Sequence, residues 1–436
     1  MNRRAVRWLL EELPGLVRGG VLTPEAADRL RQHYGAAAGP SGRRIALTVC
    51  SILGAALVGA GVILLLAHNW EELPRSARTV IALAPLAAAQ ALALWTLAAG
   101  RSSAGWREGA ATFLTLAIAA AIALVAQTYN IPGDSGTFTL TWMLLTLPVA
   151  YLLNATVPLL VYLIGITVWA GHALGDLEAL AYWPLLALAL PRLVREWRRD
   201  PFAMPAVLPG WTLCLCLLFG LGFTLVEALD ELWMISYSAL AAVLFAIGYL
   251  RFRDAPTPGQ NPWLAVGGLG IPIVSLALTF EEPWRYLGTT VWSAAARGAP
   301  LWLGGLLLAV LTAAAVLALV ALGRARRPAP FLFGLLPPLA VLGCVLRWLT
   351  SAQLPAMLLF NVYLFALGLG VLIHGIRRNR LGTVNLGMLF ITALIVARFF
   401  DTDIGFLARG IAFIAVGLGF LATNAVLVRR AKGGAQ

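Results

Sequence analysis

Polar and charged side chains gather at the ends of several long apolar stretches, and these ends are where the sequence could do chemistry. Three of them read His68-Asn69-Trp70-Glu71-Glu72, Gln127-Thr128-Tyr129-Asn130-Ile131-Pro132-Gly133-Asp134 and Arg398-Phe399-Phe400-Asp401-Thr402-Asp403. Ionisable groups beside an apolar span are costly unless they are paired or used. We therefore predict a ligand site for a cation or a polar headgroup. Its residues are Asn69, Glu71, Gln127, Tyr129, Asn130, Asp134, Arg398 and Asp401.

A simpler interpretation of each motif stays open. Tryptophan, tyrosine and acidic loop ends are ordinary at membrane interfaces. Arg398 could extend its guanidinium to the interface or pair with Asp401 three residues later. Two further stretches end in acidic residues, namely Glu227, Asp230 and Glu231 in one and Glu281 and Glu282 in the other. Glu227 is either an interfacial acid or a carrier of a proton or cation.

Catalytic and metal signatures are weak. The sequence contains no phosphate-binding loop, no supported Ser/His/Asp arrangement and no zinc motif. His172 and His374 have no partners at ligand spacing, and Cys214 and Cys216 read as small hydrophobes within an apolar stretch. We predict no catalytic residue, no metal and no cofactor. An intramembrane transferase that uses Asp401-x-Asp403 with a divalent metal is the enzymatic alternative.

The elements that position these residues follow from composition. Of the 436 residues, 60% are hydrophobic and 12% are charged, whereas soluble domains carry about 45–50% and about 25%. Because runs of about 20 apolar residues span a bilayer as helices, the sequence predicts an all-α integral membrane protein with fourteen transmembrane helices. The runs are 45–67, 79–99, 109–128, 137–153, 155–174, 178–194, 208–229, 232–250, 262–280, 300–322, 329–350, 355–376, 381–400 and 409–428.

The basic residues predict the orientation. When the connecting segments are numbered alternately, 25 of the 32 Lys and Arg fall on the side of the N-terminus. The positive-inside rule then places both termini in the cytoplasm. The formal net charge of +12 is explained by these loops, so the predicted partner is the lipid bilayer and not nucleic acid.

Residues 1–44 have soluble character and predict two short amphipathic helices on the cytoplasmic side. Val6, Leu9, Leu10 and Leu13 mark the first helix, which Pro14-Gly15 is expected to interrupt. Thr23-Pro24-Glu25 starts the second, since threonine caps and proline suits the first helical position. The predicted domains are therefore 1–44, a transmembrane domain 45–428 and a basic tail 429–436.

Several of these motifs resemble an uncharacterised bacterial family of polytopic membrane proteins, classed as a domain of unknown function and often encoded beside GDYXXLXY-domain proteins. The features that carry the resemblance are Gly20-Val21-Leu22-Thr23-Pro24-Glu25, Asn69-Trp70-Glu71, Gln127-x-Tyr129-Asn130-Ile131-x-Gly133-Asp134, Asn385-Leu386-Gly387 and Arg398-Phe399-Phe400-Asp401. Ala126 stands where the family pattern has glycine. The resemblance implies an inner-membrane location and an envelope partner of GDYXXLXY type, and it brings no activity.

Two functions fit these observations. The first is a transporter or flippase-like permease with an outward-facing polar site, favoured by many spans that are interrupted by proline and glycine. The second is a non-enzymatic scaffold that assembles with an envelope protein, favoured by the helical N-terminal segment. A permease requires a cavity that enters the membrane, whereas a scaffold can be solid. Glycines such as Gly54, Gly59, Gly61, Gly368 and Gly370 are expected to allow close helix packing.

Overall fold

The computed structural model is all-helical and has no strand in the part of the chain that it describes. It describes residues 3–35, 73–98, 104–174, 177–225, 232–285, 287, 301–324, 328–399, 410–411, 414 and 417–419. The chain divides into two compact units, Met1–Ile81 and Ala82–Gln436. The prediction of all-α structure is confirmed over these residues. The run 45–67 and most of the run 409–428 lie outside them.

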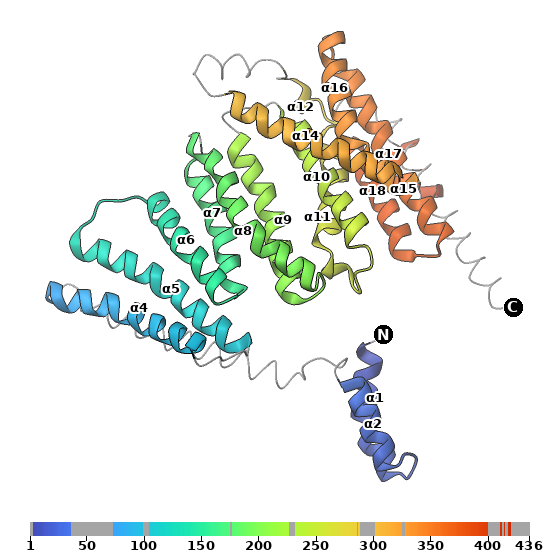
Figure 1. Ribbon diagram of the computed structural model, residues 1–436. Helices are drawn as coiled ribbons and strands as arrows, with labels where there is room; N and C mark the ends of the chain where they lie inside the picture. The colour runs from blue at the N-terminus through green and yellow to red at the C-terminus, as the bar shows by residue number, and fades with distance from the viewer. Residues whose placement is uncertain are drawn as a thin grey trace. The chain divides into compact units, whose positions relative to one another are not determined.

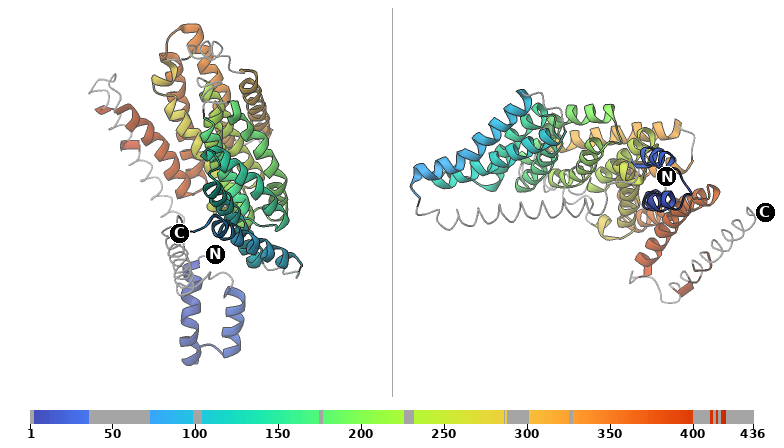
Figure 2. Two further views of the ribbon diagram at one scale, coloured as in Figure 1. Left: turned by 90° about the vertical axis from the view of Figure 1, so that its left-hand side faces the viewer. Right: turned by 90° about the horizontal axis from the view of Figure 1, so that it is seen from below.

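The first unit contains two helices that pack on each other as a hairpin (Figure 2). These are α1 (Arg3–Arg18) and α2 (Pro24–Gly35). The expected interruption at Pro14 is wrong, because α1 continues through it to Arg18 and is followed by Gly19-Gly20. There Gly20 is left-handed (φ 69°), and the Val21 N–H donates to the Leu16 carbonyl at 2.9 Å. The cap at Thr23 is confirmed, since its Oγ1 accepts from the Ala26 N–H at 3.3 Å.

Each predicted run from 79–99 to 381–400 overlaps a helix, whereas the short helix at 282–285 lies between two runs (Figure 1). The helix in the run 178–194 is not among those apolar enough to cross a membrane. The helices are α4 (Arg75–Ala98), α5 (Ala104–Tyr129), α6 (Ser135–Leu152), α7 (Val157–His172), α8 (Tyr182–Arg199), α9 (Met204–Leu225), α10 (Trp233–Arg251), α11 (Pro262–Ala277), α12 (Glu282–Arg285), α14 (Leu301–Arg324), α15 (Pro328–Gly334), α16 (Leu336–Thr350), α17 (Leu354–Arg377) and α18 (Leu381–Phe399). Short 3₁₀ turns η2 (Leu177–Ala181) and η4 (Pro258–Gln260) precede α8 and α11.

Eight of the described helices are long and apolar enough to cross a membrane, namely α4, α5, α6, α9, α10, α14, α17 and α18. Three more, α7, α11 and α16, are apolar but shorter. The predicted run 329–350 is divided between α15 and α16. Pro337 and Pro338 stand in the first turn of α16, where the missing N–H costs nothing but cannot continue the hydrogen bonds of α15.

Two helical hairpins, α10–α11 and α17–α18, are held together by reciprocal glycines (Figure 1). A Cβ on Gly248 of α10 would collide with the Leu264 backbone of α11, and one on Gly267 of α11 would collide with the Phe245 backbone of α10. Likewise, a Cβ on Gly375 of α17 or on Gly387 of α18 would collide with the backbone of the facing helix. Glycine allows such close backbone approach, so each hairpin is a tightly packed pair.

The connection between α10 and α11 is fixed by Asn261, which is buried. Its Nδ2 donates to the carbonyls of Gly248 at 3.0 Å and Phe252 at 2.9 Å, and its Oδ1 accepts from the Leu264 N–H at 3.0 Å. The side chain therefore joins the end of one helix to the start of the next. This hairpin end is one wall of the site described below.

A hydrophobic cluster lies among α7, α8 and α9. Tyr162 donates to the Leu185 carbonyl at 2.8 Å, and Tyr182 donates to the Cys216 carbonyl at 2.9 Å. Buried hydroxyls must find such partners, and here they link neighbouring helices. Cys214 and Cys216 are both buried in this cluster, as their apolar setting predicted.

Candidate functional site

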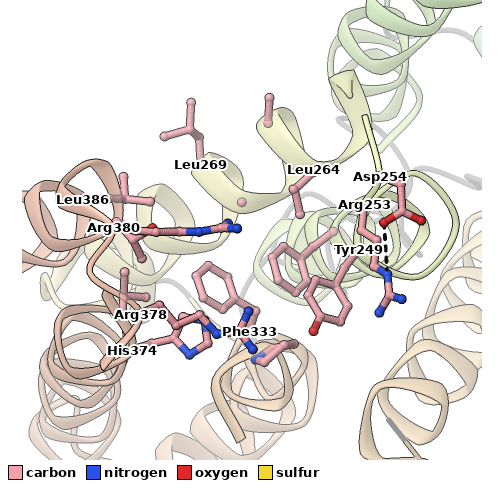
Figure 3. A pocket seen from close by; sticks show the side chains of 16 residues that line it. Tyr249, Arg253, Asp254, Leu264, Leu269, Phe333, His374, Arg378, Arg380 and Leu386 are labelled. Carbon is pink, nitrogen blue, oxygen red and sulfur yellow. Dashed lines mark ion pairs between the residues drawn. The ribbon is translucent and has the colours of Figure 1, made fainter. Parts of the chain in front are cut away.

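A pocket of about 560 Å³ lies between the two glycine-packed hairpins, at the ends that carry the α10–α11 and α17–α18 connections. Its volume falls in the range of about 300–1,000 Å³ that ligand sites usually have. Figure 3 shows Arg378, Arg380 and His374 on one side and Tyr249, Arg253 and Asp254 on the other, with Phe333 of α15 between them. The pocket therefore combines a charged rim with an aromatic interior.

The interior is made of residues within the helices. The rings of Phe245 and Phe333 stack with centroids 4.4 Å apart, and Phe245 also stacks on Tyr249 at 6.0 Å. Leu264 and Val371 line the pocket from α11 and α17. Val371 lies seven residues before Arg378, which is about 10 Å along a helix. The apolar wall thus extends about 10 Å from the helix ends toward the interior of the membrane-spanning segments.

The two arginines of the α17–α18 turn are held by a defined backbone. Asn379, between them, is left-handed (φ 52°), and the Arg380 N–H donates to the Gly375 carbonyl at 3.0 Å. This is the hydrogen bond of a helix C-terminus closed by a left-handed residue. The Arg380 carbonyl then accepts from the N–H groups of Thr383 and Val384 at the start of α18. The turn is consequently short, and it presents both guanidinium groups at one pocket edge.

A second cluster of polar side chains lies at the ends of α11 and α18 that are far from the pocket. Arg398 of α18 donates to Thr279 Oγ1 at 3.1 Å, and its guanidinium lies over the Phe280 ring, 4.7 Å from the centroid. Glu281 and Glu282 follow directly and pair with Arg285. Arg347 of α16 donates to the carbonyl of the buried Trp284 at 3.0 Å. The predicted runs 262–280 and 381–400 therefore do meet at their polar ends.

The predicted residues of the second motif surround the turn between α5 and α6. Asn130 is left-handed (φ 51°), and the Ile131 N–H donates to the Ala126 carbonyl at 2.9 Å, which closes α5. Asp134 caps α6 by accepting from the Thr137 N–H at 2.6 Å. Gln127, Tyr129, Asn130 and Asp134 all have exposed side chains. Asn130 and Asp134 thus have structural roles, and a ligand role for these four residues stays a prediction.

The hydrogen bond from Thr137 and the nearby positive end of α6 favour a charged Asp134. They hold the pKa of this carboxyl below its usual value of 3.8. Gly136, two residues on, faces His172 at the end of α7, and a Cβ added there would lie 3.6 Å from His172 Cβ. The described contacts therefore place the second motif beside α7, whereas Arg398 packs with the end of α11. Asn69, Glu71 and Asp401 lie outside the described residues.

Sequence reasoning did not identify the basic pocket. In the sequence, Arg377, Arg378 and Arg380 only contribute to the count of basic residues that predicts the orientation, and His374 has no partner at ligand spacing. The signal for the pocket in the sequence is a cluster of basic residues beside a short turn. The apolar wall could not be read from the sequence, because Phe245, Phe333 and Val371 lie in three different helices.

The sequence also did not indicate the buried pair in α8. Arg192 is 1% exposed and pairs with Glu196 one turn later. Glu108 of α5, likewise unremarked, accepts from the Thr156 and Val157 N–H groups at 2.6 and 3.1 Å, and so caps α7. Both carboxylates thus have partners within the fold, while the buried Arg192 Nε has none. Among the described residues, no three or more His, Cys, Asp or Glu gather in a way that could hold a metal ion.

The fold and this site define a multi-pass, all-helical membrane protein with a basic pocket at one end of its helices. Residues 14–159 match the model of a family described as "Predicted membrane protein (DUF2157)", whose function is unknown. This family is of the kind that the sequence motifs resemble. The matched segment contains the Gln127–Asp134 motif, while the pocket residues lie beyond it. No curated protein and no solved structure matches the chain.

Proposed function

We propose that this protein is a flippase-like permease of the bacterial inner membrane, with fourteen spans and both termini in the cytoplasm. Its substrate is an amphiphile that enters the pocket between the α10–α11 and α17–α18 hairpins. The observation that carries the proposal is that α18 holds polar groups at both of its ends. Thr383 lines the pocket together with Arg380, and Arg398 donates to Thr279 at the far end.

The polar ends of α18 are far apart along the membrane normal. Thr383 and Arg398 differ by fifteen positions, which is about 22 Å along a helix, and the apolar core of a bilayer is about 30 Å thick. Polar groups at both ends of one helix are suited to receive a ligand near either side of this core.

The packing supports a rigid-body movement of the two helical hairpins relative to each other. Each hairpin is tightly packed through its glycines, whereas α11 packs less extensively on α17 and α18 than on α10. Alternating access in transporters is largely rigid-body movement of one bundle against another. Here the α10–α11 and α17–α18 pairs are the rigid bodies that we propose, with the pocket between them.

The test is lipid translocation in liposomes that contain the purified full-length protein, with fluorescent phospholipids whose inner-leaflet fraction is measured by quenching, with and without an imposed ion gradient. Gly268→Trp fills the pocket, since a Cβ at Gly268 meets only Phe245 Cδ2, at 3.8 Å. Gly109→Trp is the control, because its Cβ meets nothing within 4 Å. We expect translocation by the wild type and the control and its loss in Gly268→Trp. A wild-type rate equal to that of empty liposomes would overturn the proposal.

A scaffold is the second candidate, and it is favoured by the hairpin of α1 and α2. Trp8 and Val21 there are 64% and 71% exposed. Large apolar side chains on such an amphipathic segment suit a protein partner, for which the family resemblance suggests an envelope protein of GDYXXLXY type. Purification from native membranes tests this candidate. A stoichiometric protein that is retained by the wild type and lost with Trp8→Ala would support it, and the absence of such a protein would overturn it.

A further inference from the structure

We propose that the pocket between the two hairpins binds an anionic phospholipid, with its phosphate at the arginine rim and its acyl chains along the aromatic wall. This inference names the substrate class of the proposed permease, and it rests on that function only for what happens after binding.

The charge of the pocket favours an anion. Its described lining holds three arginines and one carboxylate, that of Asp254. Arg253 Nε lies 3.6 Å from Asp254 Oδ1, so this pair is largely compensated. Arg378 and Arg380 have exposed side chains on the opposite edge of the pocket. Two guanidinium groups on one short turn are the donors that bind phosphate oxygens in a bidentate manner.

The helix ends at the pocket do not decide its charge. Thr383, in the first turn of α18, lines the pocket beside Arg380, so the 19-residue helix α18 begins there with its partial positive charge. The partial negative end of α17 directly precedes Arg378 and offsets it. The preference for an anion therefore rests on the two arginines.

The depth of the pocket favours an amphiphile over a water-soluble phosphate. Phe245, Phe333, Leu264 and Val371 form a wall that begins beside the arginines and extends about 10 Å along the helices. An acyl chain packs favourably against the part of this wall that faces the pocket, whereas a fully polar ligand makes no favourable contact with it. Basic pockets between transmembrane helices on the cytoplasmic side are known to hold anionic lipid headgroups, and the proposed orientation places this pocket on that side.

The test measures binding of dioleoylphosphatidylglycerol and dioleoylphosphatidylcholine to the full-length protein in mild detergent by native mass spectrometry. The two lipids have the same chains and differ in headgroup charge. The test variant is Arg378→Gln/Arg380→Gln. The matched control is Arg198→Gln/Arg199→Gln, which removes two exposed charges from the end of α8. We expect a preference for phosphatidylglycerol that falls about tenfold in the test variant only. Thermal unfolding of both variants verifies that they fold.

Equal retention of the two lipids, or an unchanged preference in the test variant, would overturn the inference. Glycerol 1-phosphate forms the other arm of the test. If it displaces the lipid at equal concentration, the phosphate group alone suffices and the ligand is not an amphiphile. Phosphatidylglycerol binding without translocation would support this inference and overturn the permease. Translocation that does not depend on headgroup charge or on Arg378 and Arg380 would support the permease and overturn this inference.

Discussion

Arg192 is a buried charge in an apolar environment, and Glu196 compensates it. The arginine side chain is 2% exposed and that of Glu196 is 12% exposed. Removal of one partner of a buried ion pair leaves the other charge uncompensated, which costs far more than the pair itself contributes. The pair therefore explains how α8 can carry an arginine on the face that packs against α7 and α9.

Glu196→Gln should destabilise the protein by about 3–5 kcal/mol. The matched variant is Asp254→Asn, which breaks the exposed pair with Arg253 and should cost less than about 1 kcal/mol. Thermal unfolding of the purified protein in detergent measures both. Equal losses in the two variants would contradict a buried role for Glu196.

Asp134 makes the stability of α6 depend on pH. Its folded pKa is lowered, chiefly because the carboxylate accepts from the Thr137 N–H. A lowered pKa means that the stabilisation is fully present above the usual value of 3.8, and is lost as the pH falls through the folded pKa. Asp134→Asn keeps a cap that does not titrate. The wild-type Tm should therefore fall more steeply than that of the variant below about pH 4. Parallel curves would show that the charge of Asp134 is irrelevant.

At the scale of elements, several helices end in the same way. Asn130, Asn154 and Asn379 are left-handed residues that directly follow, or nearly follow, the ends of α5, α6 and α17. In each case the next N–H bonds back to a carbonyl five residues earlier, that of Ala126, Ala150 and Gly375. Asparagine tolerates this conformation better than most residues. The motif Gln127–Asp134 is thus in part a signal for the end of one helix and the start of the next.

The glycine contacts of α10–α11 give a prediction at this scale. Gly267→Ala places a methyl group against the Phe245 backbone, which cannot move without separating the helices. We expect a loss of about 1–3 kcal/mol in thermal unfolding, together with weaker lipid binding in the pocket. Gly109→Ala in α5 meets nothing within 4 Å and should be neutral or stabilising by up to about 1 kcal/mol. A neutral Gly267→Ala would mean that the hairpin is not tightly packed.

The helices could be predicted from the sequence, but which helices pack against each other could not. Apolar runs indicate helices because a bilayer leaves the backbone few alternatives, and Gly368 and Gly370 were correctly expected at contacts. A Cβ on them would meet Ile391 and Leu332, respectively. The sequence could not show that Phe245 faces Phe333, nor that Gly248 and Gly267 are contact glycines while Gly109 is not. That depends on which helices become neighbours, and residues about 90 positions apart form the pocket.

At the scale of the whole molecule, the proposed orientation can be tested with two exposed glycines. Gly133 lies between α5 and α6, and Gly382 lies in the first turn of α18. A Cβ at either meets nothing within 4 Å. Fourteen spans place an odd number of crossings between them, with Gly133 outside and Gly382 in the cytoplasm.

Gly133→Cys should react with a membrane-impermeant maleimide in intact cells, and Gly382→Cys should react only after the membrane is opened. The unmodified protein provides the background, since its Cys214 and Cys216 are buried and its Cys344 is half-buried. Labelling of both variants from the same side would contradict the number of spans, and labelling in the reverse order would contradict the orientation.

The two glycine-packed hairpins also bear on how the protein is made. Contacts within α10–α11 and within α17–α18 join neighbours in the sequence, so each pair can assemble as soon as its second helix leaves the ribosome. The pocket needs α10, α11, α15, α17 and α18 together. The α10–α11 wall of the pocket is therefore complete first. It stays in the membrane while α14 to α16 are made, and Arg378 and Arg380 are added near the end of synthesis. A chain that stops before Arg378 carries the aromatic lining but not the two arginines, so the lipid binding that we propose would arise only in nearly completed protein.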